Sequence, residues 1–579
     1  KSTNYQIPEY KFVHDRIQQA AYSSIPDQEK PVIHQALGQL MLQNTPTEKR
    51  EEKLFEIVNQ LNLGQELILN QSERTELAQL NLIAGKKSKG SAAYQASLNY
   101  LRIGIEIIQF DGWEKQYSLT LEIYLEAAFS AYAHGNYQEM NELILVVLQN
   151  ARDLLDKIRA YEVKIFAYIA QGKLLDAVDT GRKVLKQLGL TLPKKPNKWD
   201  ILLGIIQVKF ILIKKMILNE KKIEDLINLP QMTNPKKIAA MSILNSIGTA
   251  TYIASPNLLP ITIFQGIILS LRYGNSLFSP VFYAGYGLIL CGVLGDIKSG
   301  CSFGKLAFKL SGKINDFKVR VRTVIVVNNF IRHWQEHGKE TLPYLIDGYY
   351  NGIETGDLEY AAIGAVGYSY YAYFIGQELT VVEKNTAKYS YAIQKIKQDQ
   401  NFYMINLNWQ VVLNLLGNSD TPYRLIGEVY DESKILPLNL AANNVNGIFD
   451  LYLHKLILCY LFGEYEKALE NSKIAEKYLE GGLGMITIPI FYFYDSLTRL
   501  HFCKHIEKSR LKCLLKKVQH NQKKMNRWAY SAPINYLHKF YLVEAEQYRV
   551  ISKDTLAIDY YDRAIALAKE NDYINEAAL

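Results

Sequence analysis

Apolar residues recur at steps of three and four positions along almost the whole chain, which is the spacing that places side chains on one face of an α-helix. Segments with the apolar–polar alternation of a strand, bounded by Asn-Gly or Asp-Gly turns, are nearly absent. The hydrophobic pattern therefore predicts an all-α protein.

A short pattern recurs at the boundaries between the expected helices. A small residue, most often glycine, is followed two positions later by an aromatic or aliphatic residue and three positions after that by a residue that is usually small. Glycine can end a helix in the left-handed conformation at little cost, and the apolar residue then begins the next helix by packing back on the first. The six instances are Ala92-x-Tyr94-x-x-Ser97, Gly135-x-Tyr137-x-x-Met140, Gly172-x-Leu174-x-x-Ala177, Gly295-x-Ile297-x-x-Gly300, Gly356-x-Leu358-x-x-Ala361 and Gly463-x-Tyr465-x-x-Ala468.

The spacing of these boundaries is the size of a helix pair. Gly135 and Gly172 are 37 residues apart, Gly295 and Gly338 are 43 apart, and Gly338 and Gly376 are 38 apart. The interval from Gly172 to Gly295, 123 residues, has room for three more pairs. Repeats of this length are typical of tetratricopeptide-like (TPR-like) arrays, so we expect a right-handed α-solenoid of such helix pairs.

Composition supports one continuous body. The chain has 579 residues, 48% of them hydrophobic and 21% charged, and its 16 prolines and 35 glycines form no linker. The net charge of +8 is too dilute to imply nucleic acid by itself. Five cysteines without a C-x-x-C pair suit buried thiols in a reducing compartment, so we expect a cytoplasmic protein. The first residues contain neither Met nor an apolar signal region, which indicates an excised or processed piece.

Two apolar runs raise the question of a membrane span. Residues 201–218 carry Lys209, Lys214 and Lys215, each of which would be costly in hydrocarbon. Residues 278–295 are uncharged but short, and Pro280 and several glycines interrupt them. We expect both runs to be helices buried in protein and no span.

Histidine-containing motifs suggest a metal site. The segment HWQEH matches the zinc-peptidase pattern H-x-x-E-H with His333 and His337, but a third protein ligand is missing. We expect these histidines at the C-terminal end of a helix, where they favour the helix dipole. A stand-alone metalloenzyme using residues 333–337 remains the alternative. In HFCKH, His501 and His505 share a helix face while Cys503 points elsewhere, so we expect no site there.

Tyrosine outnumbers phenylalanine by 41 to 21, and the densest group is YSYYAYF at 368–374. An amphipathic ring suits half-buried grooves between helices, so the first expectation is packing between helices. The alternative is an aromatic wall on the concave surface of the solenoid, open to a peptide or a small ligand. The candidate ligand or partner surface is then Tyr368, Tyr370, Tyr371 and Tyr373.

A basic stretch and the absence of catalytic motifs bound the function. Residues 504–527 hold nine Lys or Arg and one Glu, which we interpret as a solvated face, so we expect no nucleic-acid partner; binding of nucleic acid is the alternative. The chain has no P-loop, no G-x-S-x-G elbow and no kinase catalytic loop. We therefore expect no enzyme, no cofactor and no metal in this segment.

Longer phrases resemble a known family. FVHDRIQQAAYSSI (12–25) resembles the last helix of the winged-helix part of STAND/AAA-type signalling NTPases, with Phe12, His14 and Tyr22 at matching positions. TYIASPNLLP (251–260) and KLILCYLFGEYEKALENSKIAEKYL (455–479) are similar to the central region of large cyanobacterial-type hybrid kinases. In that family a serine/threonine kinase, an AAA/STAND ATPase, this helical region, a GAF domain and a histidine kinase follow one another.

The resemblance implies a domain plan. Residues 1–30 would be the end of the winged-helix, ATPase-module junction and 31–190 would be N-terminal TPR-like repeats. Residues 191–420 would be longer central repeats and 421–579 C-terminal TPR-like repeats. Phe12, His14 and Tyr22 would contact the ATPase module, and Phe12 and Val13 would lie at an exposed apolar surface in its absence.

The resemblance also implies a role. The chain would be a non-catalytic regulatory or sensor solenoid of a two-component signal-transduction kinase. Its partners would be the neighbouring ATPase and kinase domains or another protein, with a small molecule as a possible effector. ATP would bind in the neighbouring domains. Because stacked pairs contact only their neighbours, a change of curvature would spread along the array at little cost.

Overall fold

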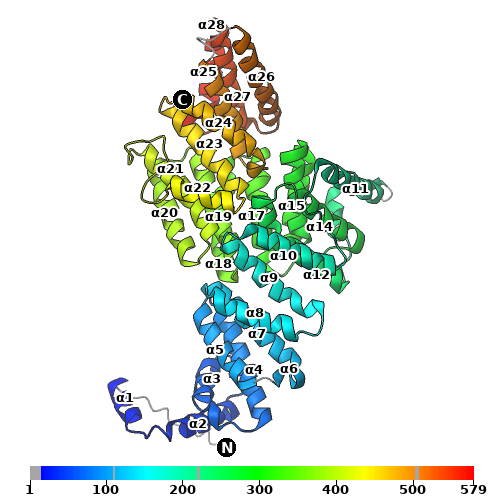
Figure 1. Cartoon of the computed structure of the whole chain (residues 1–579), viewed down its shortest axis with the longest axis vertical. Helices are drawn as coiled ribbons and strands as arrows, with labels where there is room; N and C mark the ends of the chain where they lie inside the picture. Colours follow the sequence, from blue (N-terminus) through cyan, green and yellow to red (C-terminus); the bar gives the residue numbers. More distant parts are fainter. Residues whose placement is uncertain (1–14, 109–110, 218–221, 503–507) are drawn as a thin grey trace, which may run out of the picture. The chain divides into compact units, whose positions relative to one another are not determined.

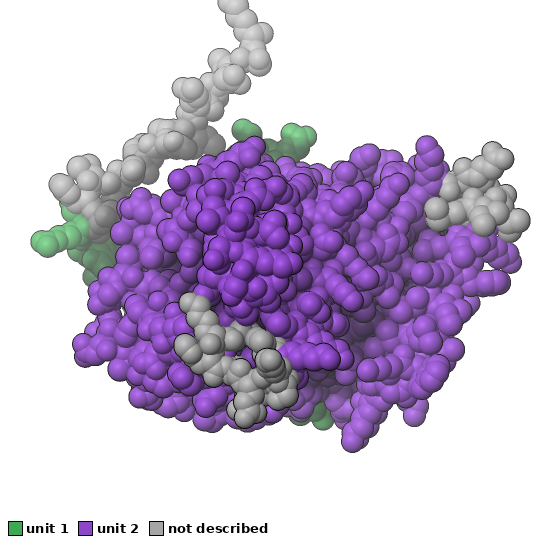
Figure 2. Space-filling model, turned by 90° about the horizontal axis from the view of Figure 1, so that it is seen from above, with its two compact units in different colours: residues 1–151 green, residues 152–579 purple. Residues whose placement is uncertain are grey.

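The computed structural model describes residues 15–108, 111–217, 222–502 and 508–579. Within these ranges the structure is helical, with two isolated bridges and no strand, so the predicted all-α fold is confirmed. The chain divides into two compact units, residues 1–151 and 152–579 (Figure 2). The predicted division into residues 1–30, 31–190, 191–420 and 421–579 remains a prediction. It describes the type of repeat along the chain, which a division into compact units does not test.

Unit 1 is a series of antiparallel helix pairs, in which α2 packs on α3, α4 on α5 and α7 on α8. Its helices are α1 (Asp15–Ser23), α2 (Lys30–Asn44), α3 (Leu54–Leu63), α4 (Gln71–Gly90), α5 (Tyr94–Ile108), α6 (Gly112–Lys115), α7 (Tyr117–His134) and α8 (Tyr137–Asn150).

Unit 2 continues with successive pairs (Figure 1). The first part has α9 (Leu154–Ala170), α10 (Leu174–Gln187), α11 (Lys198–Ile217), α12 (Pro235–Ser246), α13 (Gly248–Ala254), α14 (Leu259–Tyr273), α15 (Ser279–Ile289), α16 (Ile297–Lys313), α17 (Phe317–Phe330), α18 (Leu342–Thr355) and α19 (Leu358–Phe374). The second part has α20 (Leu379–Lys395), α21 (Asp399–Leu415), α22 (Glu432–Ala441), α23 (Val445–Leu461), α24 (Tyr465–Lys477), α25 (Thr487–His501), α26 (Lys508–Ser531), α27 (Pro533–Val550), α28 (Asp554–Glu570) and α29 (Ile574–Ala578).

The boundary pattern read from the sequence is confirmed at all six places. Each small residue has a positive φ, between 56° at Ala92 and 79° at Gly135, and the next helix begins at the apolar residue two positions later. The third residue is buried in each case. Gly338, which marks a repeat boundary only by its distance from Gly295 and Gly376, begins a short 3-10 turn (Gly338–Thr341) and has no positive φ. The interval from Gly172 to Gly295 holds α10 to α15, in which α12 and α13 follow each other almost directly, and not three regular pairs.

Unit 2 departs from a simple solenoid because distant repeats meet. Helix α13 contacts α23, and α9 contacts α21. The Asn443 side-chain amide donates to the Ala254 carbonyl at 2.6 Å, and the Tyr252 hydroxyl donates to the Leu483 carbonyl at 3.1 Å. The expectation that repeats contact only their neighbours is therefore wrong for this unit. Curvature here is held by contacts between residues roughly 200 positions apart in the sequence, not only by stacking.

The two apolar runs have different environments. Helix α15 is buried on nearly all sides, as predicted. Helix α11 is buried on one face only, so the prediction of a buried helix is wrong for its other face. The outer face is exposed because α11 packs chiefly on α14, and among the described residues no other helix covers that face (Figure 1). No helix in the described ranges is long and apolar enough to cross a membrane.

Candidate functional site

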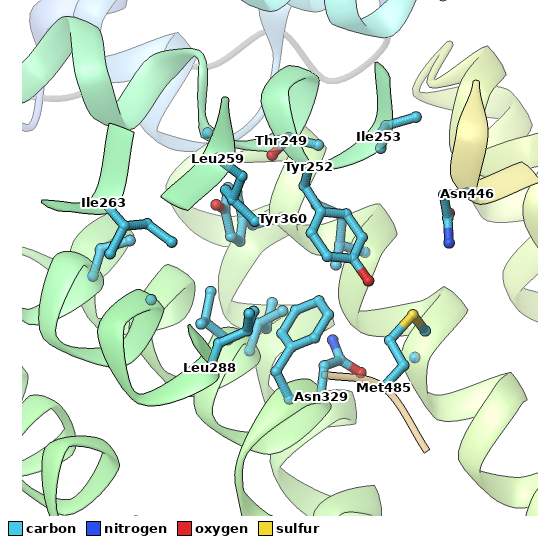
Figure 3. Close-up of a pocket in the computed structure, with 18 of the residues that line it drawn as sticks. Thr249, Tyr252, Ile253, Leu259, Ile263, Leu288, Asn329, Tyr360, Asn446 and Met485 are labelled. Carbon is cyan, nitrogen blue, oxygen red and sulfur yellow. The ribbon is translucent and has the colours of Figure 1, made fainter. Parts of the chain in front are cut away.

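Unit 2 contains an apolar cavity of about 140 Å³ (Figure 3). Its wall is built from α12, α13, α14, α15, α17, α19, α21 and α23, together with Met485 from the segment before α25. The lining therefore comes from residues that span positions 244 to 485. The cavity exists because distant repeats meet, as described above.

The cavity lining is predominantly aliphatic and aromatic, including Leu259, Ile263, Leu288, Phe330 and Met485. None of the described side chains that line it carries a charge. An apolar cavity of roughly this size, about 150 Å³, can bind a molecule as large as benzene. The space is therefore suited to a compact uncharged ligand.

Two carboxamide oxygens give the cavity a polar feature. Oδ1 of Asn245 and Oδ1 of Asn329 are buried without a hydrogen-bond donor among the described residues. A buried acceptor left without a partner costs about 1–3 kcal/mol, so a ligand donor would be favourable once rotation of a carboxamide brings its oxygen into the cavity. Gly367 makes room for Asn329, because a Cβ at that position would lie 2.3 Å from Oδ1. In Figure 3, Asn329 faces the same space as Tyr252 and Met485.

Asp450 carries a buried carboxyl group that is hydrogen-bonded to two residues of the cavity lining. The Tyr370 hydroxyl and the Asn446 amide donate to Oδ2 of Asp450 at 3.2 and 3.3 Å, and Asn446 also donates to the Gly481 carbonyl at 2.8 Å. Burial raises the pKa of Asp450 to about 7. Because Tyr370 and Asn446 both line the cavity, Asp450 couples α19 to α23 directly behind it.

A cluster of ionisable residues, Arg322, Asp357 and Glu359, contacts other residues of the cavity lining. Arg322 forms a buried ion pair with Asp357, with Nε–Oδ2 at 2.5 Å and Nη2–Oδ1 at 3.1 Å. Its guanidinium lies 4.7 Å from the ring centre of Tyr360, which lines the cavity. Glu359, hydrogen-bonded to Thr249 of the lining, has its pKa raised to about 7 by burial. The neutral wall is thus held in place by charged groups that do not line the cavity.

The four tyrosines predicted as a ligand surface are divided by the structure. Tyr370 lines the cavity. Tyr371 is buried, and its hydroxyl donates to the backbone carbonyl of Asn329 at 2.9 Å. Tyr368 and Tyr373 are half-buried and pack against the core of unit 2. The four side chains therefore do not form one exposed wall, and whether they meet a ligand stays a prediction.

Sequence reasoning missed the two asparagines that carry the unpartnered oxygens. The available signal was a polar carboxamide inside an apolar helical run, in MSILNSIG for Asn245 and in VIVVNNF for Asn329. A side chain of this kind in a core needs a partner. The signal names no site by itself, because the cavity depends on contacts that the sequence does not display.

The motif at 333–337 has a structural role. Helix α17 ends at Phe330, and the motif follows in a 3-10 turn (Arg332–Trp334) and the residues after it, so it is not on a regular α-helix. The Nε2 atom of His333 donates to the Gly484 carbonyl at 2.9 Å, and its Nδ1 accepts from the Tyr536 hydroxyl at 2.6 Å. Burial lowers the pKa of His333 to about 4.

His337 is engaged in the same way. Its Nε2 donates to the Asn571 carbonyl at 2.8 Å, and its Nδ1 accepts from the backbone of Lys339 at 2.9 Å. The two histidines join the turn to the end of the chain, about 200 residues away, and their ring nitrogens are occupied by these bonds. Within the described ranges, no group of three or more His, Cys, Asp or Glu is placed to hold a metal ion.

The remaining predicted residues lie at the ends of the described ranges. Phe12, Val13 and His14 fall outside the described residues, as do Cys503 and His505. Tyr22 is exposed, and its hydroxyl lies 2.8 Å from Nε2 of His34. The ring of His501 stacks on Tyr465, with centroids 3.5 Å apart.

The basic stretch belongs largely to α26. Lys517 pairs with Glu476, and Lys524 lies over the ring of Tyr492 at 4.4 Å. Lys516, Lys523 and other basic side chains of the described part of this helix are exposed. The helix thus presents part of its charge to solvent and uses part in packing on unit 2.

Comparison with known proteins points to signalling. No family model matches the chain. The chain is 25% identical over 445 residues to the hybrid signal transduction histidine kinase G of Dictyostelium discoideum. The matched part is 70% of this chain and 13% of that protein, so the chain spans a small fraction of its relative's length. This similarity relates the chain to a signal-transduction histidine kinase.

Proposed function

We propose that this chain is a non-catalytic regulatory solenoid of a multidomain signal-transduction kinase, and that it binds a small effector in the cavity of unit 2. The observation that carries the proposal is a neutral, apolar cavity at the place where eight helices from distant repeats converge. Similarity to a hybrid histidine kinase supports the signalling context.

The lining defines the chemical class of the effector. An ionised ligand would lose its hydration without meeting an opposite charge, which is costly. An uncharged, largely apolar molecule about the size of one aromatic ring would gain by leaving water. A hydroxyl or N–H on that molecule would donate to Oδ1 of Asn245 or of Asn329.

The position of the cavity supplies a route for regulation. A ligand in it touches α12 to α15 on one side and α21 and α23 on the other. Two hydrogen bonds join α13 to segments outside these helices: Tyr252 of α13 donates to Leu483, in the segment before α25, and Asn443, in the turn before α23, donates to Ala254 of α13. In the closed state both of these bonds are formed, and in the open state they are broken. A ligand that binds the closed state more tightly than the open state shifts the population toward the closed state. Neighbouring ATPase and kinase domains of the parent protein would respond to that shift, and ATP would bind there.

Binding of phenol and benzene tests the proposal. The two molecules are nearly equal in size, but only phenol carries a hydroxyl donor. Isothermal calorimetry on the chain should show both binding, with phenol about fivefold tighter, because one added hydrogen bond contributes about 1 kcal/mol. Asn329→Leu should weaken that preference while benzene still binds, and Asn245→Leu should act likewise.

The matched control is Asn351→Leu, which changes an exposed asparagine of α18 outside the cavity lining. This variant should bind both molecules as the unaltered chain does. Failure of both molecules to bind the folded chain would refute the proposed site. Equal binding of the two molecules would refute the role given to the carboxamide oxygens.

A further inference from the structure

The outer face of α11 is a continuous apolar stripe. Trp199, Leu202, Leu203, Ile206, Phe210 and Ile213 are each between 43% and 73% exposed. At 3.6 residues per turn they occupy an arc of roughly 100° along the whole length of the helix.

The inner face of the same helix is packed. Gly204 lies against Phe264 of α14, where a Cβ would come within 2.4 Å of the ring, and Val208 and Leu212 are buried. The exposed stripe therefore belongs to a helix that unit 2 already holds in place. A large apolar surface of this kind on a folded protein marks an interaction site.

Lysines border the stripe on both sides. Lys198 and Lys209 follow one edge and Lys214 follows the other, and all three are exposed. Lys194 and Lys195, also exposed, come immediately before the helix. The acidic residue within α11, Asp200, accepts a bond from the backbone of Asn197 at the helix start. The border of the stripe is thus strongly basic.

We propose that α11 binds the surface of an anionic phospholipid bilayer and lies in the plane of the headgroups. The apolar stripe enters the boundary between headgroups and acyl chains, and the bordering lysines extend their amines to the lipid phosphates and carboxylates. Trp199 suits this depth, since its ring is apolar and its N–H can remain in the polar layer. The helix lies on the bilayer and does not cross it, and the proposal is independent of the cavity.

Charge and area favour a bilayer over a second copy of the chain. If two α11 helices met along their stripes, the lysines of one would face the lysines of the other, which is repulsive. One helix on one helix also buries less than the roughly 1,000 Å² expected of a stable protein interface. A bilayer offers negative charge on both sides of the stripe and accepts a single convex helix without a matching groove.

Co-sedimentation of the chain with vesicles tests the proposal. We expect binding to vesicles of phosphatidylcholine with phosphatidylserine and much weaker binding to phosphatidylcholine alone. The double variant Ile206→Gln/Phe210→Gln should lower the partition coefficient about tenfold or more, because it removes two of the buried apolar side chains. Lys209→Gln/Lys214→Gln should lower binding chiefly at low salt. Brominated lipid should quench tryptophan emission of the unaltered chain more than that of Trp199→Phe.

The control variant is Leu556→Gln/Ile558→Gln, which changes two exposed apolar residues of α28. It should bind vesicles as the unaltered chain does. Absence of binding to the anionic vesicles would overturn the proposal, and so would equal loss of binding in the control. A dimer in sedimentation velocity that Ile206→Gln/Phe210→Gln abolishes, without vesicle binding, would assign the stripe to a second copy and overturn it as well.

Discussion

Filling the cavity is the most direct test of its existence. Gly248 begins α13 and lines the cavity, and a Cβ at this position would meet no described atom within 4 Å. A Cβ therefore fits there without displacing a neighbouring side chain, and we expect the rest of a leucine side chain to extend into the cavity that Gly248 lines. Gly312, an exposed glycine of α16 outside the cavity lining, also has no described atom within 4 Å of its Cβ position. Gly248→Leu and Gly312→Leu thus form a matched pair.

The two substitutions should differ by the burial of one side chain. Full burial of leucine contributes about 1.5–3 kcal/mol, and since Gly248 is itself partly exposed we expect about 1–2 kcal/mol. Both variants also gain about 0.5–1 kcal/mol because a helical glycine is replaced. The free energy of unfolding of Gly248→Leu should therefore exceed that of Gly312→Leu by about 1–2 kcal/mol.

Urea unfolding measures this difference. The urea midpoint of the unit 2 transition should rise in Gly248→Leu relative to Gly312→Leu at an unchanged slope. Calorimetry should show that Gly248→Leu no longer binds benzene, while Gly312→Leu binds it normally. If Gly248→Leu is no more stable than Gly312→Leu and still binds benzene, the leucine has not entered a cavity and the reasoning is wrong.

Three further changes follow from the groups around the cavity. Because burial raises the pKa of Asp450 to about 7, the folded chain keeps a proton that the unfolded chain releases above the ordinary aspartate pKa of 3.8. The unaltered chain should therefore lose stability relative to Asp450→Asn as pH rises from about 4 to about 7, by a few kcal/mol in urea titrations. The ring of His454 lies 5.8 Å from that of Tyr370 in the cavity lining, and its nitrogens have no partner among the described residues. Burial lowers the pKa of His454 to about 3, so His454→Phe should be more stable by about 1–2 kcal/mol at neutral pH and gain further as pH falls below 6.5. Gly367→Ala should displace Asn329, cost about 1–3 kcal/mol in urea unfolding and remove the preference for phenol in calorimetry.

Each of these expectations has a result that would contradict it. A pH-independent difference between Asp450→Asn and the unaltered chain would show that this carboxyl does not keep its proton on folding. A less stable His454→Phe would show that the imidazole makes a bond that the structure lacks. A Gly367→Ala variant with unchanged stability and an unchanged phenol preference would show that Asn329 does not need the space that glycine leaves.

The helix pairs and their boundaries could be predicted from the sequence because their causes are local. The six turns depend on a residue that tolerates positive φ, an apolar residue at the start of the next helix and a third residue compact enough to be buried. All of these lie within six positions of one another. Gly338 shows the limit of local patterns, because it lacks the apolar residue two positions later and begins a 3-10 turn whose first N–H donates to the distant Asn535.

The cavity and the exposed stripe were decided by tertiary structure. Asn245 and Asn329 become a polar feature of a cavity only because repeats from position 244 to position 485 surround one space. His333 becomes an anchor only because Tyr536 and Gly484 lie beside it. Helix α11 has apolar residues on two opposite faces, separated by lysines and other polar residues, and its packing on α14 determines which of the two faces is buried and which stays exposed. A local pattern specifies which residues can form a helix and where it ends, but the energy of long-range packing specifies which of its faces meets protein.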